Sequence, residues 1–445
     1  MQNTAQGSVS ASQGIVEDAD HIISEARQTD YSNIRGARSA ARLASVFKPD
    51  RITNYYPKIR PTLLERLFGY DRQTFRNWEA DKSTGKGPVL RPVLEGQNNA
   101  QRRYYTVNDI LSIYDYLEKN DEYRPALPSP VKLAVWNNKG GVGKTTIVQQ
   151  LASTMSILMG LKVLVVDTDS QSDCTYMLNC NQEIKEVREN YDTQPTIRHI
   201  FGFLDIDHET GSETEYITPL NDGIITLSPT LSIIPADSDV SELDYDFSFL
   251  ENLLKDDKGR DVSKIANISD RFLNDVLDTK QYDVIIFDCA PNKGALNLNI
   301  LYGADTLLIP IEVEAKCLYS LRNVLKFLKK MKNFHEGFSF NKVIGVPNKY
   351  IHTHNLKRLG LEKLKEIFQG SILSSSVIPH TTELDKCADE KEPVFIRASD
   401  NIKSRSTLMA KRVSNEFFKL SHEVLGLDNN HRVLFPEVEN IYDEV

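Results

Sequence analysis

Residues 131–146 read VKLAVWNNKGGVGKTT, and this stretch decides the fold. The apolar segment VKLAVW (131–136) is typical of a short buried β-strand. The residues that follow match the phosphate-binding loop pattern GxxxxGK[ST], with Asn138 or Lys139 in the place of the first glycine. Glycines in such a loop let backbone N–H groups converge on phosphate oxygens, and the next helix directs its positive end at the anion. We therefore expect a strand, a nucleotide-binding loop and a helix within an α/β fold.

The loop pattern assigns a role to each polar residue. Lys144 is expected to hold the β- and γ-phosphates of ATP, Thr145 to ligate Mg²⁺ and Thr146 to reach the α-phosphate. The remaining contacts come from the backbone of the loop, which contains Gly140, Gly141, Val142 and Gly143.

Further apolar segments predict a P-loop NTPase with a mostly parallel central sheet, because they alternate with helical stretches. The predicted strands are LKVLVVD (161–167), YDVIIFD (282–288), ADTLLIPI (304–311), KVIGVP (342–347) and ILSSSVIP (372–379). Weaker strand patterns occur at 223–228 and 231–236, inside an acidic, irregular stretch. Asp288, an acid at the carboxyl end of an apolar strand, is expected to hold Mg²⁺ through water.

KGGVGKTT (139–146) resembles the deviant phosphate-binding motif of the ParA/MinD ATPase superfamily. The resemblance covers about residues 131–425. The hallmark of the superfamily is an additional lysine, here Lys139, which reaches across a homodimer interface to the ATP of the partner. A cation supplied in trans would offset charge that develops on the phosphoryl group, and it makes dimerisation depend on ATP. The resemblance also implies that hydrolysis of ATP is slow and is stimulated by a partner protein.

The resemblance extends to other strand ends. The superfamily has D-x-D-P-Q where this chain has Asp167-Thr168-Asp169-Ser170-Gln171. That match implies that Asp169 positions the attacking water and that Asp167 supports the magnesium shell. Ser170 departs from the usual proline. For recognition of the base, the matching residues are Asn348, after a late strand, and Pro379, after the next.

Composition limits the remaining possibilities. A chain of 445 residues is expected to form two or three domains. No run approaches the roughly 20 apolar residues of a membrane span, and the N-terminus lacks a secretory pattern. The five cysteines are odd in number and lack metal-ligand spacing, which favours a reducing, intracellular compartment. We expect a cytoplasmic, nucleoid-associated protein.

Charge is distributed unevenly along the chain. The net charge is −9, yet residues 31–103 contain 15 Lys and Arg against 6 Asp and Glu. A basic module on an acidic body indicates contact with nucleic acid. Residues 1–47 are expected to be a flexible segment and a helix from Ile15 that could support dimerisation. Residues 48–126 are expected to form a DNA-binding domain, and residues 127–445 the ATPase domain.

The predicted DNA-binding domain resembles the winged helix-turn-helix of MerR-like regulators. PTLLERLFGYDRQTFRNWEA (61–80) predicts two short helices around a turn at Gly69, and a further helix follows Thr106. The second helix would enter the major groove, and basic residues of the wing would contact phosphates. The candidate contacts are Arg72, Gln73, Arg76, Arg102 and Arg103. The alternative is a small helical protein-binding domain.

A second basic group lies near the C-terminus. The resemblance places sequence-independent DNA binding there, and the candidates are Arg397, Lys403, Arg405, Lys411 and Arg412. Membrane binding, as in MinD, is not expected because the tail LFPEVENIYDEV is acidic and would be repelled by anionic lipid.

The sequence therefore predicts a DNA-partition ATPase that uses ATP and Mg²⁺. Its expected partners are DNA, without sequence preference and also at an operator, and a ParB-like centromere-binding protein. Two alternatives remain open: a nucleotide-regulated transcriptional repressor without a role in segregation, and an ATPase that positions a protein cargo.

Overall fold

A computed structural model gives the structure of the chain. It describes residues 57–80, 87–96, 102–119, 127–178, 205–206, 213–214, 224–236, 240–241, 281–314, 316–334, 337–368, 372–399, 404–427 and 433–438. All of them belong to one structural unit, residues 54–445. The helix expected from Ile15, and Lys403, lie outside the described residues.

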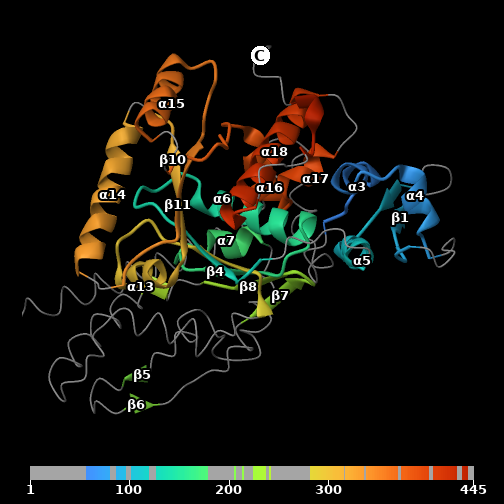
Figure 1. Cartoon of the computed structure of the whole chain (residues 1–445), viewed down its shortest axis with the longest axis horizontal. Coiled ribbons are helices and arrows are strands. Elements are labelled where there is room, and N and C mark those ends of the chain that lie inside the picture. The colour runs from blue at the N-terminus through green and yellow to red at the C-terminus, as the bar shows by residue number, and fades with distance from the viewer. Residues whose placement is uncertain are drawn as a thin grey trace, which may run out of the picture. The chain divides into compact units, whose positions relative to one another are not determined.

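The central sheet is a mostly parallel, seven-stranded sheet (Figure 1). Its strands, in spatial order, are β11 (Lys342–Asn348), β10 (Thr306–Glu312), β3 (Val131–Val135), β9 (Val284–Asp288), β4 (Val163–Asp167), β8 (Leu231–Ile234) and β7 (Ile225–Ser228). Only β7 and β8 pair antiparallel; all other neighbours are parallel. The predicted fold class is confirmed. A two-stranded pair, β5 (Asp205–Ile206) and β6 (Glu213–Thr214), is separate.

Helices cover both faces of the sheet. Successive strand residues point to opposite faces, and both sets of side chains are apolar and buried under helices. Leu133 and Val135 belong to one core, and Ala134 and Trp136 belong to the other. Figure 1 shows the helices of the two layers on either side of the strands. The first core includes residues of α6 (Lys144–Ser153), η4 (Thr154–Leu158), α7 (Asp173–Met177), α16 (Thr382–Glu390), α17 (Val394–Ala398) and α18 (Arg405–Leu425). The second includes residues of α13 (Ala295–Gly303), α14 (Cys317–Phe334) and α15 (Asn355–Phe368).

The segment 57–119 has the order of elements that the sequence predicts. The elements are α3 (Pro61–Phe68), α4 (Arg72–Asn77), the antiparallel strands β1 (Val93–Glu95) and β2 (Arg102–Tyr104), and α5 (Val107–Glu118). Gly69 makes the turn with φ of 74°, a value that glycine adopts without strain. Asp71 accepts a hydrogen bond from the Thr74 N–H at 2.7 Å and caps α4, and Thr106 forms a capping box with Asp109. The role of this segment in DNA binding stays a prediction.

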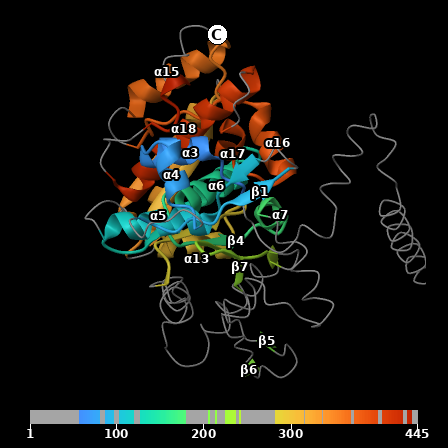
Figure 2. The same cartoon turned by 90° about the vertical axis from the view of Figure 1, so that its right-hand side faces the viewer.

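The N-terminal segment, residues 57–119, and the region from residue 131 onward share one apolar core. The Tyr114 hydroxyl of α5 donates a hydrogen bond of 2.5 Å to the Leu158 carbonyl, at the end of the π-helix η4. Gly160 has φ of 67°, and a Cβ there would approach the Tyr114 ring to 2.9 Å. Glycine is therefore required for this close contact. Figure 2 shows α3 and α5 alongside the helices of the first layer.

A second contact joins α3 to the C-terminal segment. Arg66 donates two hydrogen bonds to the Glu437 carboxylate, at 2.6 and 2.7 Å, and Lys411 of α18 donates a third at 2.9 Å. Glu437 lies in η8 (Pro436–Val438), whose neighbour Phe435 is buried and exchanges two backbone hydrogen bonds with the Asn415 side chain.

One predicted strand is wrong. Residues 372–379 form only isolated bridges, at Leu373 and Pro379, and no ladder. The segment exchanges backbone hydrogen bonds with Gly345 and Pro347 of β11 at two separate points. Between and beside these points, glutamate side chains of α18 bind it: Glu416 accepts from the Val377 N–H at 2.9 Å, and Glu423 accepts from the Ser374 hydroxyl at 2.7 Å. The apolar pattern indicated burial correctly. Part of the backbone of this segment, however, hydrogen-bonds to side chains of α18 and not to a neighbouring strand.

Candidate active site

The predicted nucleotide-binding residues gather at one edge of the sheet. The P-loop follows β3, Asp167 ends β4, Asp288 ends β9, and Asn348 ends β11. These strands are parallel, so their carboxyl ends meet at the same edge, which is where open α/β sheets bind ligands.

The P-loop has the backbone that anion binding requires. Gly141 and Gly143 have φ of 71° and 87°, in the left-handed region that favours glycine. A Cβ on Gly140 or Gly141 would meet no atom within 4 Å, so their backbone is open on that side. The helix α6 begins at Lys144, directly after the loop, and its N-terminus favours an anion.

Lys144 and Asp288 form the buried charged centre of the site. The Lys144 side chain is only 7% exposed, and burial lowers the pKa of its ammonium. Burial, followed by the negative charge of Asp167, raises the pKa of Asp288 well above its usual value. Both Asp288 oxygens are buried and lack a hydrogen bond of good geometry within the described part of the chain, and only the nearby Thr145 hydroxyl and Lys144 ammonium offset the rise of the Asp288 pKa. Such an unsatisfied carboxylate fits a Mg²⁺ ion and its waters, because Mg²⁺ prefers oxygen ligands.

Asp167 and Asp169 differ in their surroundings. One Asp167 oxygen accepts from the Thr175 hydroxyl and N–H, at 2.7 and 2.9 Å, and the other accepts from the Asp169 N–H at 3.2 Å. Burial nonetheless raises the pKa of Asp167 to about 6. Asp167 therefore anchors α7 to the sheet, while Asp169 lies half-buried in the loop after β4. This arrangement favours a supporting role for Asp167 over direct ligation.

Lys139 is held within its own chain. Its ammonium donates to Glu312, the last residue of β10, at 2.5 Å and to Glu314, which follows two residues later. Partial burial alone would lower the pKa of Lys139, but the two carboxylates raise it. The lysine that the resemblance assigns to the partner subunit thus contacts two acids of its own chain, and the sequence patterns missed both acids.

Asn348 contacts the P-loop. Its Nδ2 donates to the Val142 carbonyl at 2.7 Å. A Cβ on Gly143 would lie 2.5 Å from the Asn348 Nδ2, so glycine is needed there. Lys349, which the sequence patterns also missed, has φ of 53° and donates to the Gly141 carbonyl at 2.7 Å. These contacts place Asn348 next to the nucleotide loop, as expected for a residue near the base, and its contact with the base stays a prediction.

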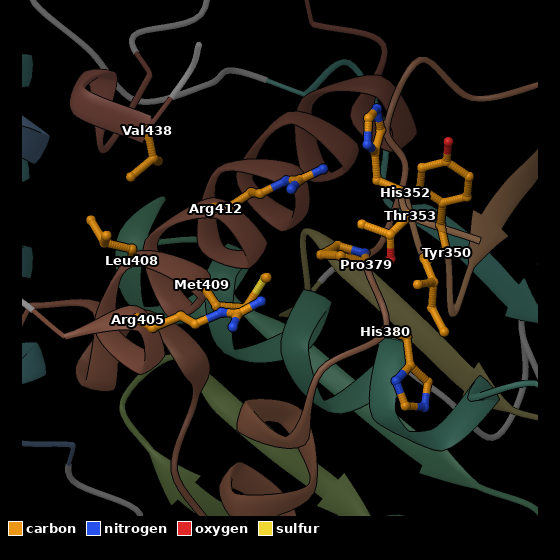
Figure 3. A pocket seen from close by; sticks show the side chains of 11 residues that line it. Tyr350, His352, Thr353, Pro379, His380, Arg405, Leu408, Met409, Arg412 and Val438 are labelled. Carbon is orange, nitrogen blue, oxygen red and sulfur yellow. The ribbon is translucent and has the colours of Figure 1, made fainter. Parts of the chain in front are cut away.

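Pro379 lines a pocket of about 200 Å³ beside this edge (Figure 3). Arg405 and Arg412 extend from α18 toward the loops that contain Pro379, His352 and His380. Leu408 and Met409 provide apolar walls. The pocket therefore brings a predicted base contact and two predicted DNA contacts together. Within the described ranges, no group of three or more His, Cys, Asp and Glu residues could hold a metal ion.

Three other candidate DNA contacts form ion pairs within the chain, and their contact with DNA stays a prediction. Arg397 is 18% exposed and pairs with Glu383 at 3.1 Å and with Glu390. Lys411 pairs with Glu437, as described above, and Arg103 pairs with the buried Glu79 at 2.9 Å. A carboxylate of the same chain therefore already neutralises each cation. These residues stabilise the fold, and a phosphate would have to displace their partners.

The helix α4 presents the remaining N-terminal candidates at the surface. Arg76 is exposed, whereas Arg72 pairs with Glu65 at 2.7 Å and Gln73 donates to Asn77 at 2.9 Å. Arg102 is exposed on β2. None of the helices that the structure describes is long and apolar enough to cross a membrane.

Known proteins resemble this chain across the ATPase region. Residues 131–342 match the family model of an AAA domain. The chain is 30% identical over 253 residues to "Putative replication protein A" of Sinorhizobium fredii. The aligned region covers 55% of each chain, so this chain spans about half the length of that relative. It is 21% identical to the chromosome partitioning protein ParA of Caulobacter vibrioides over 67% of this chain and 96% of that one. A solved structure described as a partition protein shares the fold, with a TM-score of 0.54, 20% identity, and coverage of 81% and 95%.

Proposed function

We propose that this protein is an ATP-hydrolysing DNA-partition switch, because the region from residue 131 onward has a P-loop NTPase fold and is similar to ParA-type partition proteins. It hydrolyses ATP slowly, forms a homodimer when ATP is bound, and in that state binds DNA without sequence preference. A ParB-like centromere-binding protein stimulates hydrolysis and resets the cycle. The protein acts in the cytoplasm, on the nucleoid.

One observation carries the proposal: a buried lysine and a buried, unsatisfied carboxylate meet at a P-loop. Lys144 would bind the β- and γ-phosphates, and Thr145 and Asp288 would hold Mg²⁺, which supplies charge neutralisation during phosphoryl transfer. Asp169 would orient the attacking water. Desolvation strengthens these interactions, because charges attract more strongly in a medium of low dielectric constant.

Dimer formation requires Lys139 to leave Glu312 and Glu314. Only then could its ammonium reach the ATP of the partner subunit. Dimerisation would also bring two copies of the α18 basic residues onto one surface, and two linked weak sites bind DNA more tightly than one by effective concentration. Arg405 and Arg412 are the described residues that we assign to this surface.

The test is binding to random-sequence duplex DNA with ATP, with ADP and without nucleotide, at matched salt. We expect binding only with ATP, and loss of that binding in the Arg405→Gln/Arg412→Gln variant. The Arg76→Gln variant is the matched control, because it removes an exposed arginine of α4 instead. Equal binding in all three nucleotide states would contradict the switch.

A second candidate function is a nucleotide-regulated repressor. The helix–turn–helix–hairpin–helix order of residues 57–119 favours a module that reads one DNA site, with α4 in the major groove. If both activities exist, Arg76→Gln should weaken only binding to the specific site. Site-specific binding without any ATP-dependent binding to random duplex would favour the repressor.

A further inference from the structure

The helices α14 and α15 have an unusual number of large apolar side chains that are exposed. Half of the large hydrophobic residues that the structure describes as exposed lie on these two helices. They are Tyr319 and Phe334 on α14, with Leu356, Leu359 and Ile367 on α15. Tyr319 is 69% exposed and Ile367 is 57% exposed. Exposed apolar residues are ordinary when scattered, but a concentration on two neighbouring helices indicates a contact surface.

One of these exposed residues, Ile367, also lines a groove between α14 and α15, which has a volume of about 380 Å³. We call it the α14–α15 groove. Its apolar lining is Leu318, Leu325, Ile367 and Phe368, and its charged lining is Arg322, Lys326 and Lys329. Leu318, Leu325 and Phe368 also pack on the second core, so the floor of the groove is part of the fold. In Figure 1 the two helices lie at the edge of the ATPase region that ends with β11.

The charge of the groove has one sign. The helix α14 contains five Lys and Arg residues and no Asp or Glu, although the whole chain has a net charge of −9. Among the described residues, no carboxylate forms an ion pair with Arg322, Lys326 or Lys329, and none lines the groove. On α15, by contrast, Glu362 lies within 4.0 Å of Arg358. Uncompensated cations at spacings of three and four residues form one face of a helix.

We propose that the α14–α15 groove docks an acidic amphipathic helix of a partner protein. Apolar side chains of such a helix would cover Leu325, Ile367 and Phe368, while its carboxylates would face Lys326 and Lys329. This is the helix-in-groove mode of peptide recognition, in which apolar burial provides affinity and charge complementarity provides rate and specificity.

The apolar floor selects this occupant over nucleic acid. A phosphate backbone would satisfy the lysines, but it would leave Ile367 and Phe368 in contact with water. The groove between the two helices is also concave. It therefore accommodates side chains that project from a partner better than it accommodates a partner with a flat surface. The proposal concerns a binding surface on a face of α14 that the nucleotide site does not use, so it does not depend on the partition role.

The experiment measures binding of a labelled synthetic peptide to the full-length protein by fluorescence anisotropy. The peptide is a helix of about 20 residues with Leu at helical spacing and Glu elsewhere. A peptide of the same composition in scrambled order and a random duplex of DNA are the comparison probes. We expect the amphipathic peptide to bind with an affinity that falls as salt rises.

Two variants test the two halves of the groove. The Lys326→Glu/Lys329→Glu variant reverses the charge of the groove, and the Ile367→Asn variant removes apolar surface. Each variant should weaken binding of the amphipathic peptide by about tenfold or more. Lys365→Glu, on α15 but outside the groove, should have no effect. Unchanged nucleotide binding and melting temperature confirm that each variant folds. Equal binding of the scrambled peptide, or unchanged affinity in both groove variants, would overturn the proposal. Competition by duplex DNA that depends on Lys326 and Lys329 would assign the surface to nucleic acid instead.

Discussion

Burial sets the chemistry of individual residues in the candidate site. Lys144 is almost completely enclosed, and the unsatisfied carboxylate of Asp288 is enclosed with it. A desolvated charge that lacks a full set of hydrogen bonds is costly. A phosphate and a divalent cation would supply the missing partners, which explains why the fold tolerates this centre.

Substitutions at Lys144 and Asp169 should therefore separate binding from hydrolysis. Lys144→Ala should abolish tight ATP binding, because the phosphates lose their buried cation. Asp169→Ala should retain ATP binding and slow hydrolysis by about a hundredfold, because the attacking water is no longer oriented. Binding of a fluorescent ATP analogue and release of phosphate measure the two effects. Hydrolysis at the wild-type rate in Asp169→Ala would refute the role assigned to that residue.

The contact of Lys139 with Glu312 and Glu314 leads to a second prediction. Glu312→Gln/Glu314→Gln should favour the ATP-bound dimer, because the lysine no longer leaves two ion pairs on assembly. Both pairs are partly exposed, so the gain should be about 1 kcal/mol, or about fivefold in the dimerisation constant. Analytical ultracentrifugation with ATP measures the constant, and Glu362→Gln is the control. A weaker dimer in the double variant would contradict this account and indicate that the acids support assembly.

Between elements, the contact of α3 with η8 depends on one carboxylate. Partial burial alone would raise the pKa of Glu437, but hydrogen bonds from Arg66 and Lys411 lower it to about 2, below its ordinary 4.5. A depressed pKa means that the ionised carboxylate stabilises the folded state above about pH 4.5, and that this contribution disappears as the pH falls toward 2.

Glu437→Gln should accordingly lower the free energy of unfolding by about 1 kcal/mol at neutral pH, because the group is partly exposed to solvent. The difference from the wild type should shrink as the pH falls through the interval between 4.5 and about 2. Urea unfolding across a pH series measures it, with Glu366→Gln as an exposed control. A difference that does not depend on pH would mean that packing, and not charge, accounts for the loss.

For the molecule as a whole, the shared core predicts cooperative unfolding of the N-terminal segment with the ATPase region. The chain has two tryptophans, Trp78 beside α4 and Trp136 at the end of β3. In Trp136→Phe, fluorescence reports the N-terminal segment, and in Trp78→Phe it reports the ATPase region. In each variant the fluorescence midpoint in urea should coincide with the midpoint from far-UV circular dichroism. An earlier fluorescence midpoint in Trp136→Phe would show that the segment unfolds separately.

The sequence by itself determined the features that repeat locally. Apolar segments predicted β3, β4, β9, β10 and β11 to within a few residues, because a buried parallel strand is a continuous apolar run. The spacing of glycines and Lys144 predicted the P-loop, and acids at strand ends predicted Asp167 and Asp288. The sequence also predicted the helix caps at Asp71 and Thr106, because the capping hydrogen bond of each is made within its own helix.

Only the tertiary structure decided which distant residues meet. Lys139 contacts Glu312, Asn348 contacts Val142, and Arg66 contacts Glu437, and in each case more than 170 positions separate the partners. The ion pairs of Arg397 with Glu383 and of Arg103 with Glu79 join residues that are closer in sequence, but the charge pattern did not predict them either. Residues 372–379 had the pattern of a strand, yet side chains of α18 bind their backbone. The physical reason is common to all of these: a local pattern reports whether a residue prefers burial or solvent, whereas the order of strands and the packing of helices determine which partner satisfies its charge or hydrogen bond.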